Sequence, residues 1–297
     1  MSSLLDIPYI HSPERSLYHR FDLHLPHNAG DVINAATKAN PLICFVHGGA
    51  WRSEDKSDHV GLARSLADAI GFAVAVPNYR LTGSDHEFQH PGHAEDILHF
   101  LTFLLNWEGP EHDNTGRLYD PTKLYLMGHS CSAHMLASIF LDTSPVTPSL
   151  LPSTSLLQSV QGIVTSEGIF DIDLLLVHFP SYRDWFIEPT FGDLAAYSKF
   201  SVNKYPFRNE AIRWLVVHSQ GDTLVDVAQS EAMLGHLRDL KKNSHQSDIH
   251  ANLNRLRREH NDILKGDPIF VDIVRDFILT DDSKYNKHPE DTYGDNA

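Results

Sequence analysis

The 297-residue sequence has few cysteines, few basic residues and no long apolar run. Its two cysteines, Cys44 and Cys131, are too few for a framework of several disulfides or for a four-cysteine zinc site, and they favour a reducing compartment. The 24 Lys and Arg stand against 39 Asp and Glu, so the net charge of −15 argues against nucleic acid or an anionic membrane as a partner.

Segments for membrane insertion or export are also missing from the sequence. No apolar stretch approaches the ~18 residues that a membrane-spanning helix needs. The first residues, MSSLLDIPYI, lack the basic start and the long apolar centre of a signal peptide. We therefore expect a soluble, cytoplasmic protein. The sequence leaves open whether it forms a homodimer.

Short apolar segments alternate with stretches of helical spacing along most of the chain. Segments typical of strands lie at 17–25, 41–49, 72–76, 123–127, 159–167 and 212–219. Segments with helical spacing lie at 56–70, 94–107, 132–141, 226–240 and 268–279. This alternation predicts βαβ units, and hence an α/β fold with a mostly parallel central sheet and helices on both faces.

Three regions interrupt this alternation. Residues 170–210 are rich in aromatic side chains without strand periodicity, which predicts a small cap inserted into the sheet domain. Residues 241–250 are polar and predict a loop, and residues 280–297 predict a disordered tail. We therefore expect one domain over residues 1–279.

The segment KLYLMGHSCSAH (123–134) places Ser130 in a turn between a buried strand and a helix. A nucleophile on such a turn projects above the sheet, and the N-terminus of the following helix faces the reacting carbonyl. The usual pattern is G-x-S-x-G, whereas this sequence has Ser132 at the last position. The alternative is a strand-to-helix turn that happens to contain a serine.

The segment HGGAW (47–51) follows another buried strand. Gly48 and Gly49 would let backbone amides turn toward an oxyanion, with the amide of Cys131 as a further donor. We expect the thiol of Cys131 to be a bystander. Trp51 is expected to form a wall of the pocket for the acyl group, and the alternative is that it only supports the loop.

An acid and a base must follow the nucleophile in this chain order. Asp222 lies in the turn QGD after the strand at 212–219, while the rival Asp226 is better placed as a helix cap. His260, just before the last helix, is the candidate base. Four other histidines are less suitable, two in the polar loop and two beside the serine turn: His245, His250, His129 and His134.

A histidine cluster, His86, His90 and His93, is the main candidate for metal binding. Pro91 and Gly92 interrupt it, and the sequence has no HExxH spacing. We expect neither a metal nor an organic cofactor.

Together with NYRL (78–81) and the QGD turn, HGGAW and GHSCSAH resemble the α/β-hydrolase superfamily, near its hormone-sensitive-lipase-like branch. The segments EGIFDIDLLLVHFPSYRDWF (167–186), VVHSQGDTLV (216–225) and EHNDIL (259–264) extend this to a resemblance to the kynurenine formamidases, or arylformamidases. The similarity covers most of residues 41–279.

The resemblance implies a serine hydrolase that cleaves N-formyl-L-kynurenine to kynurenine and formate, a step of tryptophan degradation. It implies a nucleophile at Ser130, an acid at Asp222 and a base at His260, and no cofactor. The oxyanion hole would consist of three amides, those of Gly48, Gly49 and Cys131. The partner would be a small-molecule aryl formamide.

The aromatic residues of the cap are candidates for substrate binding. Phe179, Tyr182, Trp185 and Phe186 could stack on an aryl leaving group, or they could only pack the cap onto the sheet. Arg183 is the nearest cation for a substrate carboxylate, although a surface position suits it better. Two other functions stay open: a general carboxylesterase of the same branch, and a hydrolase-fold binding module without catalysis.

Overall fold

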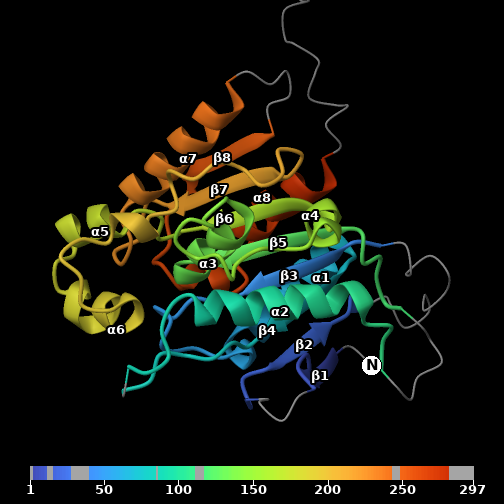
Figure 1. The fold of residues 1–297 in the computed structure, drawn as a ribbon. Coiled ribbons are helices and arrows are strands. Elements are labelled where there is room, and N and C mark those ends of the chain that lie inside the picture. The colour runs from blue at the N-terminus through green and yellow to red at the C-terminus, as the bar shows by residue number, and fades with distance from the viewer. Residues whose placement is uncertain are drawn as a thin grey trace, which may run out of the picture.

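An eight-stranded sheet runs through the centre of the molecule in the order β1-β2-β4-β3-β5-β6-β7-β8 (Figure 1). The computed structural model describes residues 3–11, 16–27, 40–84, 86–110, 117–242 and 248–280. The strands are β1 (Ser3–Pro8), β2 (Arg20–His24), β3 (Leu42–Val46), β4 (Ala73–Pro77), β5 (Leu124–His129), β6 (Val160–Ser166), β7 (Arg213–Ser219) and β8 (Ile249–Leu256). The neighbours from β4 to β8 pair in parallel, whereas β1 and β2 join antiparallel. This confirms the mostly parallel sheet that the sequence predicts.

Alternating side chains of the central strand β3 explain why helices cover both faces of the sheet. Leu42 and Val46 belong to one buried cluster, whereas Ile43 and Phe45 belong to a second cluster on the opposite face. The first cluster includes residues of α2 (Gly92–Asn106), α3 (Cys131–Phe140) and α7 (Val227–Lys241), and the second those of α1 (Val60–Ile70) and α8 (Pro268–Leu279). Figure 1 shows α2 and α3 in front of the sheet and α1 and α8 behind it.

The predicted helices and strands of the alternating region are all present, with two differences. The segment 56–70 begins as a 3-10 helix, η3 (Lys56–His59), before α1. The polar loop predicted at 241–250 is wrong at both ends, because Lys241 still belongs to α7 and β8 begins at Ile249. Residues 243–247 lie outside the described part of the chain, as does the predicted tail beyond Thr280.

Short helices fill the segment between β6 and β7, where the sequence predicts a cap. They are α5 (Ile172–His178), the π-helix η4 (Arg183–Ile187), α6 (Glu188–Phe191) and the 3-10 helix η5 (Ser198–Phe200). A further short helix, α4 (Thr154–Ser159), precedes β6. Figure 1 shows α5 and α6 projecting from one end of the sheet. Aromatic side chains of η4 line the cavity described below.

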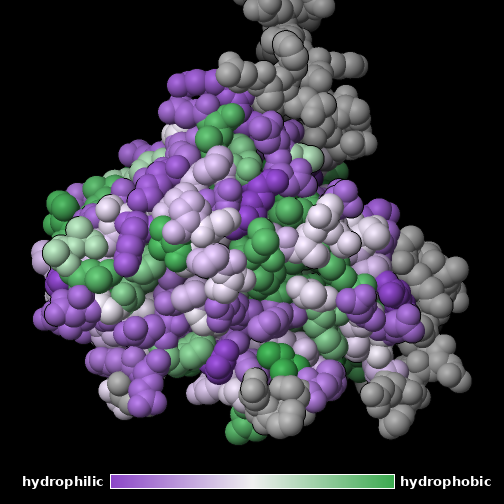
Figure 2. Space-filling model, in the orientation of Figure 1, coloured by the Kyte–Doolittle hydropathy of each residue, from purple (hydrophilic) through white to green (hydrophobic). Residues whose placement is uncertain are grey.

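The surface in the view of Figure 2 is mostly hydrophilic, with hydrophobic residues in scattered groups among charged and polar ones. No helix within the described ranges combines the length and the apolar content that crossing a bilayer requires.

Candidate active site

Ser130 lies in a strained turn between β5 and α3. Its backbone has φ 57° and ψ −122°, a conformation that residues other than glycine rarely adopt. Two contacts hold the turn: the amide of Ser130 donates to the carbonyl of Ser166 at 2.9 Å, and Gly128 packs against the carbonyl of Ser132. A Cβ atom at Gly128 would lie 2.7 Å from that carbonyl oxygen, so this close approach requires glycine. The turn places the hydroxyl group of Ser130 at the carboxyl edge of the sheet.

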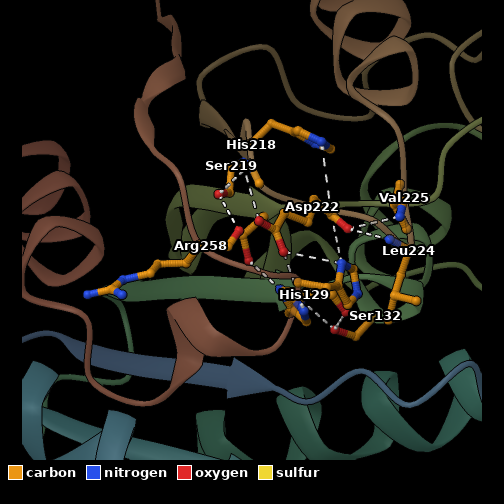
Figure 3. Close-up of polar contacts among 12 residues, drawn as sticks. His129, Ser132, His218, Ser219, Asp222, Leu224, Val225 and Arg258 are labelled. Carbon is orange, nitrogen blue, oxygen red and sulfur yellow. Dashed lines mark hydrogen bonds and ion pairs between the residues drawn. The ribbon is translucent and has the colours of Figure 1, made fainter.

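Ser132 explains how this sequence tolerates a departure from the usual glycine. Its hydroxyl oxygen accepts a hydrogen bond from the amide of His129 at 2.7 Å (Figure 3). The hydroxyl donates to the carbonyl oxygen of Val46 at 2.6 Å. The Ser132 side chain therefore links the end of β5 to the end of β3. Since Ser132 is fully buried, these bonds satisfy backbone groups that water cannot reach.

The loop after β3 approaches this turn closely. A Cβ atom at Gly48 would lie 3.2 Å from both the carbonyl oxygen of His129 and the Cβ atom of Ser130. Gly49 has φ 88°, and a Cβ there would lie 2.1 Å from the carbonyl oxygen of Ser53, so only glycine fits. The structure thus brings Gly48 and Gly49 beside Ser130.

The thiol of Cys131 has a structural role that the sequence did not indicate. Its sulfur accepts a hydrogen bond from the amide of Trp51 at 3.2 Å, and the hydroxyl of Tyr79 lies 3.9 Å away. Burial raises the pKa of the Cys131 thiol to about 12, so the thiol stays protonated at neutral pH. The side chain of Cys131 supports the loop rather than offering a nucleophile.

Asp222 follows β7 and makes a fixed turn with its own backbone. Its Oδ1 accepts hydrogen bonds from the amides of Leu224 at 2.8 Å and Val225 at 3.0 Å (Figure 3). Its Oδ2 lies 2.7 Å from Nδ1 of His260 and 4.0 Å from Nε2 of His218. The side chain of Asp222 is fully buried, so its carboxylate oxygens interact with these groups rather than with water.

His260 lies in the loop between β8 and α8, with its ring against that of His129 at a centroid distance of 4.4 Å. Burial alone would lower its pKa, but the hydrogen bond to Asp222 and the nearby carboxylate of Glu167 raise the pKa of His260 to about 9. Both His260 and Ser130 line one cavity. The structure therefore brings together all three residues that the sequence singles out as nucleophile, acid and base.

Glu167 is a site residue that the sequence interpretation missed. It follows β6 directly, and its fully buried side chain places Oε2 3.2 Å from Nδ1 of His260. Its Oε1 accepts a hydrogen bond from the amide of Ser219 at 3.2 Å. Burial raises the pKa of Glu167 to about 7. Its position at the carboxyl end of a strand is the same sequence signal that identifies Asp222.

The cavity has a polar end at Ser130 and an aromatic wall from the segment between β6 and β7. Its lining residues are Gly49, Ala50, Ser53, Glu54, Ser130, Ile169, Tyr182, Trp185, Phe186, Leu224, Val225, His260 and Asn261. Tyr182 also donates from its hydroxyl to the carbonyl of Leu224 at 3.1 Å. The structure thus places the predicted residues Tyr182 and Trp185 on the cavity. It also adds Glu54, Ile169 and Asn261, which the sequence did not indicate.

Trp51 is not among the described residues that line the cavity, contrary to its predicted place in the acyl pocket. Its indole is fully buried and packs against His134, Phe186 and Phe191 at centroid distances of 5.5, 6.1 and 5.2 Å. The alternative interpretation, that Trp51 supports the loop, agrees with this packing.

Other sequence candidates lie outside the cavity. Asp226 caps α7 by accepting from the amide of Ala228 at 3.0 Å, which confirms its predicted role as a cap. Arg183 contacts Asp193 at 3.3 Å and does not line the cavity in the described structure. His134 reaches the carbonyl of Phe200 from Nε2 at 2.8 Å. His250 lies in β8, and His245 is outside the described residues.

Two groups of side chains could supply three ligand atoms to a metal within the described ranges. They are His47 with Glu54 and His59, and His129 with Glu167 and His260. In the first group Nε2 of His59 contacts Glu54 at 3.1 Å, and in the second Nδ1 of His260 contacts Asp222 at 2.7 Å. One histidine of each group therefore already contacts a carboxylate. The expectation of no metal stays a prediction.

A parallel sheet with a strained serine after β5, and with an aspartate and a histidine meeting beyond β7 and β8, defines an α/β-hydrolase. The family model BD-FAE matches residues 22–237, so the chain belongs to the BD-FAE family and is a hydrolase.

Known relatives agree with this class. A kynurenine formamidase of Scheffersomyces stipitis is 24% identical over 235 residues, which cover 71% of this chain and 82% of that protein. A probable isoprenylcysteine alpha-carbonyl methylesterase of Oryza sativa subsp. japonica is 26% identical over 228 residues, covering 74% of this chain and 51% of that protein. The structure of esterase B from Lactobacillus rhamnosis shares the fold, with a TM-score of 0.68 at 16% identity, covering 93% of this chain and 84% of that one. The chain is therefore a kynurenine formamidase-like α/β-hydrolase.

Proposed function

We propose that this hydrolase removes the formyl group of an aryl formamide, N-formyl-L-kynurenine in particular, to give the aryl amine and formate. The observation that carries the proposal is that Ser130 and His260 line one aromatic-walled cavity, with Asp222 2.7 Å from Nδ1 of His260. The similarity to the Scheffersomyces stipitis kynurenine formamidase supports the choice of substrate.

In the proposed reaction Ser130 is the nucleophile. Its Oγ attacks the formyl carbon while Nε2 of His260 takes the hydroxyl proton, and Asp222 holds Nδ1 of His260. The backbone amides of Cys131, Gly48 and Gly49 stabilise the oxyanion, assisted by the N-terminus of α3. His260 then donates its proton to the aryl nitrogen as the C–N bond breaks. Water attacks the formyl ester, formate leaves, and Ser130 regains its proton.

Glu54 supports a substrate that carries an ammonium group. Its side chain lines the cavity and is 20% exposed. Burial raises its pKa, but the hydrogen bond and electrostatic interaction with His59, together with the interactions with His47 and His260, lower the pKa of Glu54 below its usual value, so the carboxylate is charged at neutral pH. The described lining residues include no Lys or Arg. We therefore assign Glu54 to the ammonium group of the amino-acid end of the substrate, with Tyr182 and Trp185 against its aryl ring.

The second candidate function is that of a carboxylesterase. It is favoured by the similarity to the probable methylesterase of rice. The deciding experiment compares kcat/KM for N-formyl-L-kynurenine with kcat/KM for short p-nitrophenyl esters. The proposal expects the formamide to be the better substrate. A better rate on the esters would favour the second candidate, and absence of labelling by a serine-directed phosphonate would favour a binding module.

A further inference from the structure

Glu167 is a buried acid beside His260 that the proposed mechanism does not use. Its backbone has φ 49°, and its amide donates to the carbonyl of Val217 at 2.9 Å. Its side chain is fully buried, with one oxygen bound to the amide of Ser219. An ionised carboxylate without a nearby positive charge would be costly in this position.

The charged and titratable groups around Glu167 come from several elements. They are His129 at the end of β5, His218 and Asp222 at the end of β7, His260 before α8, and, further out, Glu54 and His59 beyond β3. Burial lowers the pKa of both His129 and His218, so these two rings are neutral near pH 7. His260 is therefore the group that can present a positive charge to Glu167.

The contacts with His260 are unequal but close. Nδ1 of His260 lies 2.7 Å from Oδ2 of Asp222 and 3.2 Å from Oε2 of Glu167. Of these two contacts, the one with Asp222 has the geometry of a hydrogen bond, and the one with Glu167 is a close ion-pair contact. We propose that Glu167 is a positioning residue that holds the Nδ1 side of His260 together with Asp222, so that two carboxylates stabilise the imidazolium formed when His260 takes up a proton. This inference rests on the proposed role of His260 as the base.

The protons of this group can be counted. With Asp222 ionised and a proton on Nδ1, one further proton resides either on Glu167 or on Nε2 of His260. When it is on Glu167, Nε2 is free to accept the proton of Ser130. When it is on Nε2, both carboxylates are charged and His260 cannot act as a base. At higher pH this proton is lost, and Nε2 is free. Glu167 therefore moves the onset of activity to higher pH than Asp222 alone would give.

The test is the pH dependence of Glu167→Gln, which has nearly the same shape and keeps an oxygen for the amide of Ser219. The readouts are hydrolysis of p-nitrophenyl acetate and the rate of labelling by a serine-directed phosphonate. The acid limb is the part of the pH profile in which the rate rises with pH. Its midpoint should fall by about one pH unit, because one of the two negative charges near His260 is gone. The rate above that limb should fall by no more than about tenfold, since the base is weaker by about one pKa unit.

Two matched variants separate positioning from structural support. Glu167→Asp keeps the charge, and its acid limb should stay closer to that of the wild type. Asp226→Asn removes a carboxylate that caps α7 outside the cavity, and its acid limb should not move. An unchanged acid limb in folded Glu167→Gln would overturn the inference.

Two further measurements keep the inference testable if the glutamine variant does not fold. In the wild type the acid limb should have its midpoint above ~6.5, the ordinary value for histidine. A midpoint below that value would overturn the inference. Ser130→Ala serves as the control for the proposed function itself. If Ser130→Ala is still labelled, the proposed nucleophile is wrong. If Ser130→Ala is not labelled, but the acid limb of Glu167→Gln has the same midpoint as that of the wild type, only the role of Glu167 is refuted.

Discussion

The sulfur of Cys131 accepts a hydrogen bond from the backbone amide of Trp51, 3.2 Å away. Both residues are fully buried, so no water can replace the sulfur as an acceptor. Trp51 also has φ 59°, and the preceding Ala50 has φ 52°, so the loop is held in a conformation that such residues rarely adopt. The contact therefore fixes the loop that carries Gly48 and Gly49 against the turn that carries Ser130.

We predict that Cys131→Ala destabilises the protein by ~1–3 kcal/mol, because the buried amide of Trp51 loses its acceptor. Cys131→Ser keeps an acceptor at this position and should lose less. Urea denaturation of the two variants measures the difference. The alanine variant should also retain activity, since Ser130 and its partners remain. Equal stability of the two variants would show that the sulfur contact contributes little, and a folded but inactive Cys131→Ala would move the nucleophile to the cysteine.

The second prediction concerns the proposed nucleophile. Ser130→Ala should reduce kcat by ~10⁴–10⁶ with little change in stability, because it removes one hydroxyl group from a turn whose shape depends on backbone contacts. His260→Ala should be similarly severe, and Asp222→Asn milder. Ser138→Ala, on α3 but outside the described lining of the cavity, is the matched control and should keep its activity. Retention of a tenth of the wild-type rate by Ser130→Ala would refute the mechanism.

The third prediction concerns Ser132, where the sequence departs from the usual glycine. Ser132→Ala leaves the buried amide of His129 without its partner and breaks the link to Val46. We expect a loss of ~1–3 kcal/mol in the free energy of unfolding, measured by urea denaturation. Ser132→Thr retains the hydroxyl and tests whether added volume alone is harmful. An alanine variant as stable as the wild type would show that this hydroxyl does not support the turn.

The centre of the fold was predictable because its strands are short apolar runs buried on both faces. Strand β3, with every residue buried, is an example. The edge strands could not be predicted in this way. Strand β8 has mostly half-buried or exposed residues and carries polar side chains such as Asn252. Strand β1 contains a register shift between Leu4 and Ile7, which breaks the alternation expected of a strand.

The site shows the same division between local and distant information. Ser130 and Asp222 could be found because each follows a predicted strand, and His260 because it precedes the last helix. The contact between Glu167 and His260 joins residues from two loops far apart in the chain, and no local pattern encodes it. The burial of Trp51 against Phe186 and Phe191 likewise depends on how the segment between β6 and β7 packs, which the sequence HGGAW does not contain.

The fourth prediction tests Glu54 as the partner of a substrate ammonium group. A hydrogen-bonded charge pair in a partly buried cavity contributes ~1.5–3 kcal/mol, so Glu54→Gln should raise KM for N-formyl-L-kynurenine ~10–100-fold. KM for N-formylaniline, which has no ammonium group, should change little. Glu259→Gln, whose carboxylate contacts Thr223 and does not belong to the described lining of the cavity, is the control. Equal effects of Glu54→Gln on both formamides would assign Glu54 to loop support through His59 instead.

The last prediction concerns the size of the acyl group. Ile169 lines the cavity, is 2% exposed, and its amide donates to the carbonyl of Ser130 at 3.3 Å, so its side chain limits the space beside the proposed nucleophile. On one aryl leaving group, kcat/KM should fall from formyl to acetyl to butyryl by roughly 10–200-fold per added methylene. Ile169→Ala should flatten this series because it opens that space, whereas Trp51→Phe should not, since the indole is fully buried and is not among the described lining residues of the cavity. A wild-type enzyme that prefers butyryl would refute the formamidase proposal in favour of the esterase, and a flattened series in Trp51→Phe alone would restore Trp51 as the wall of the acyl pocket.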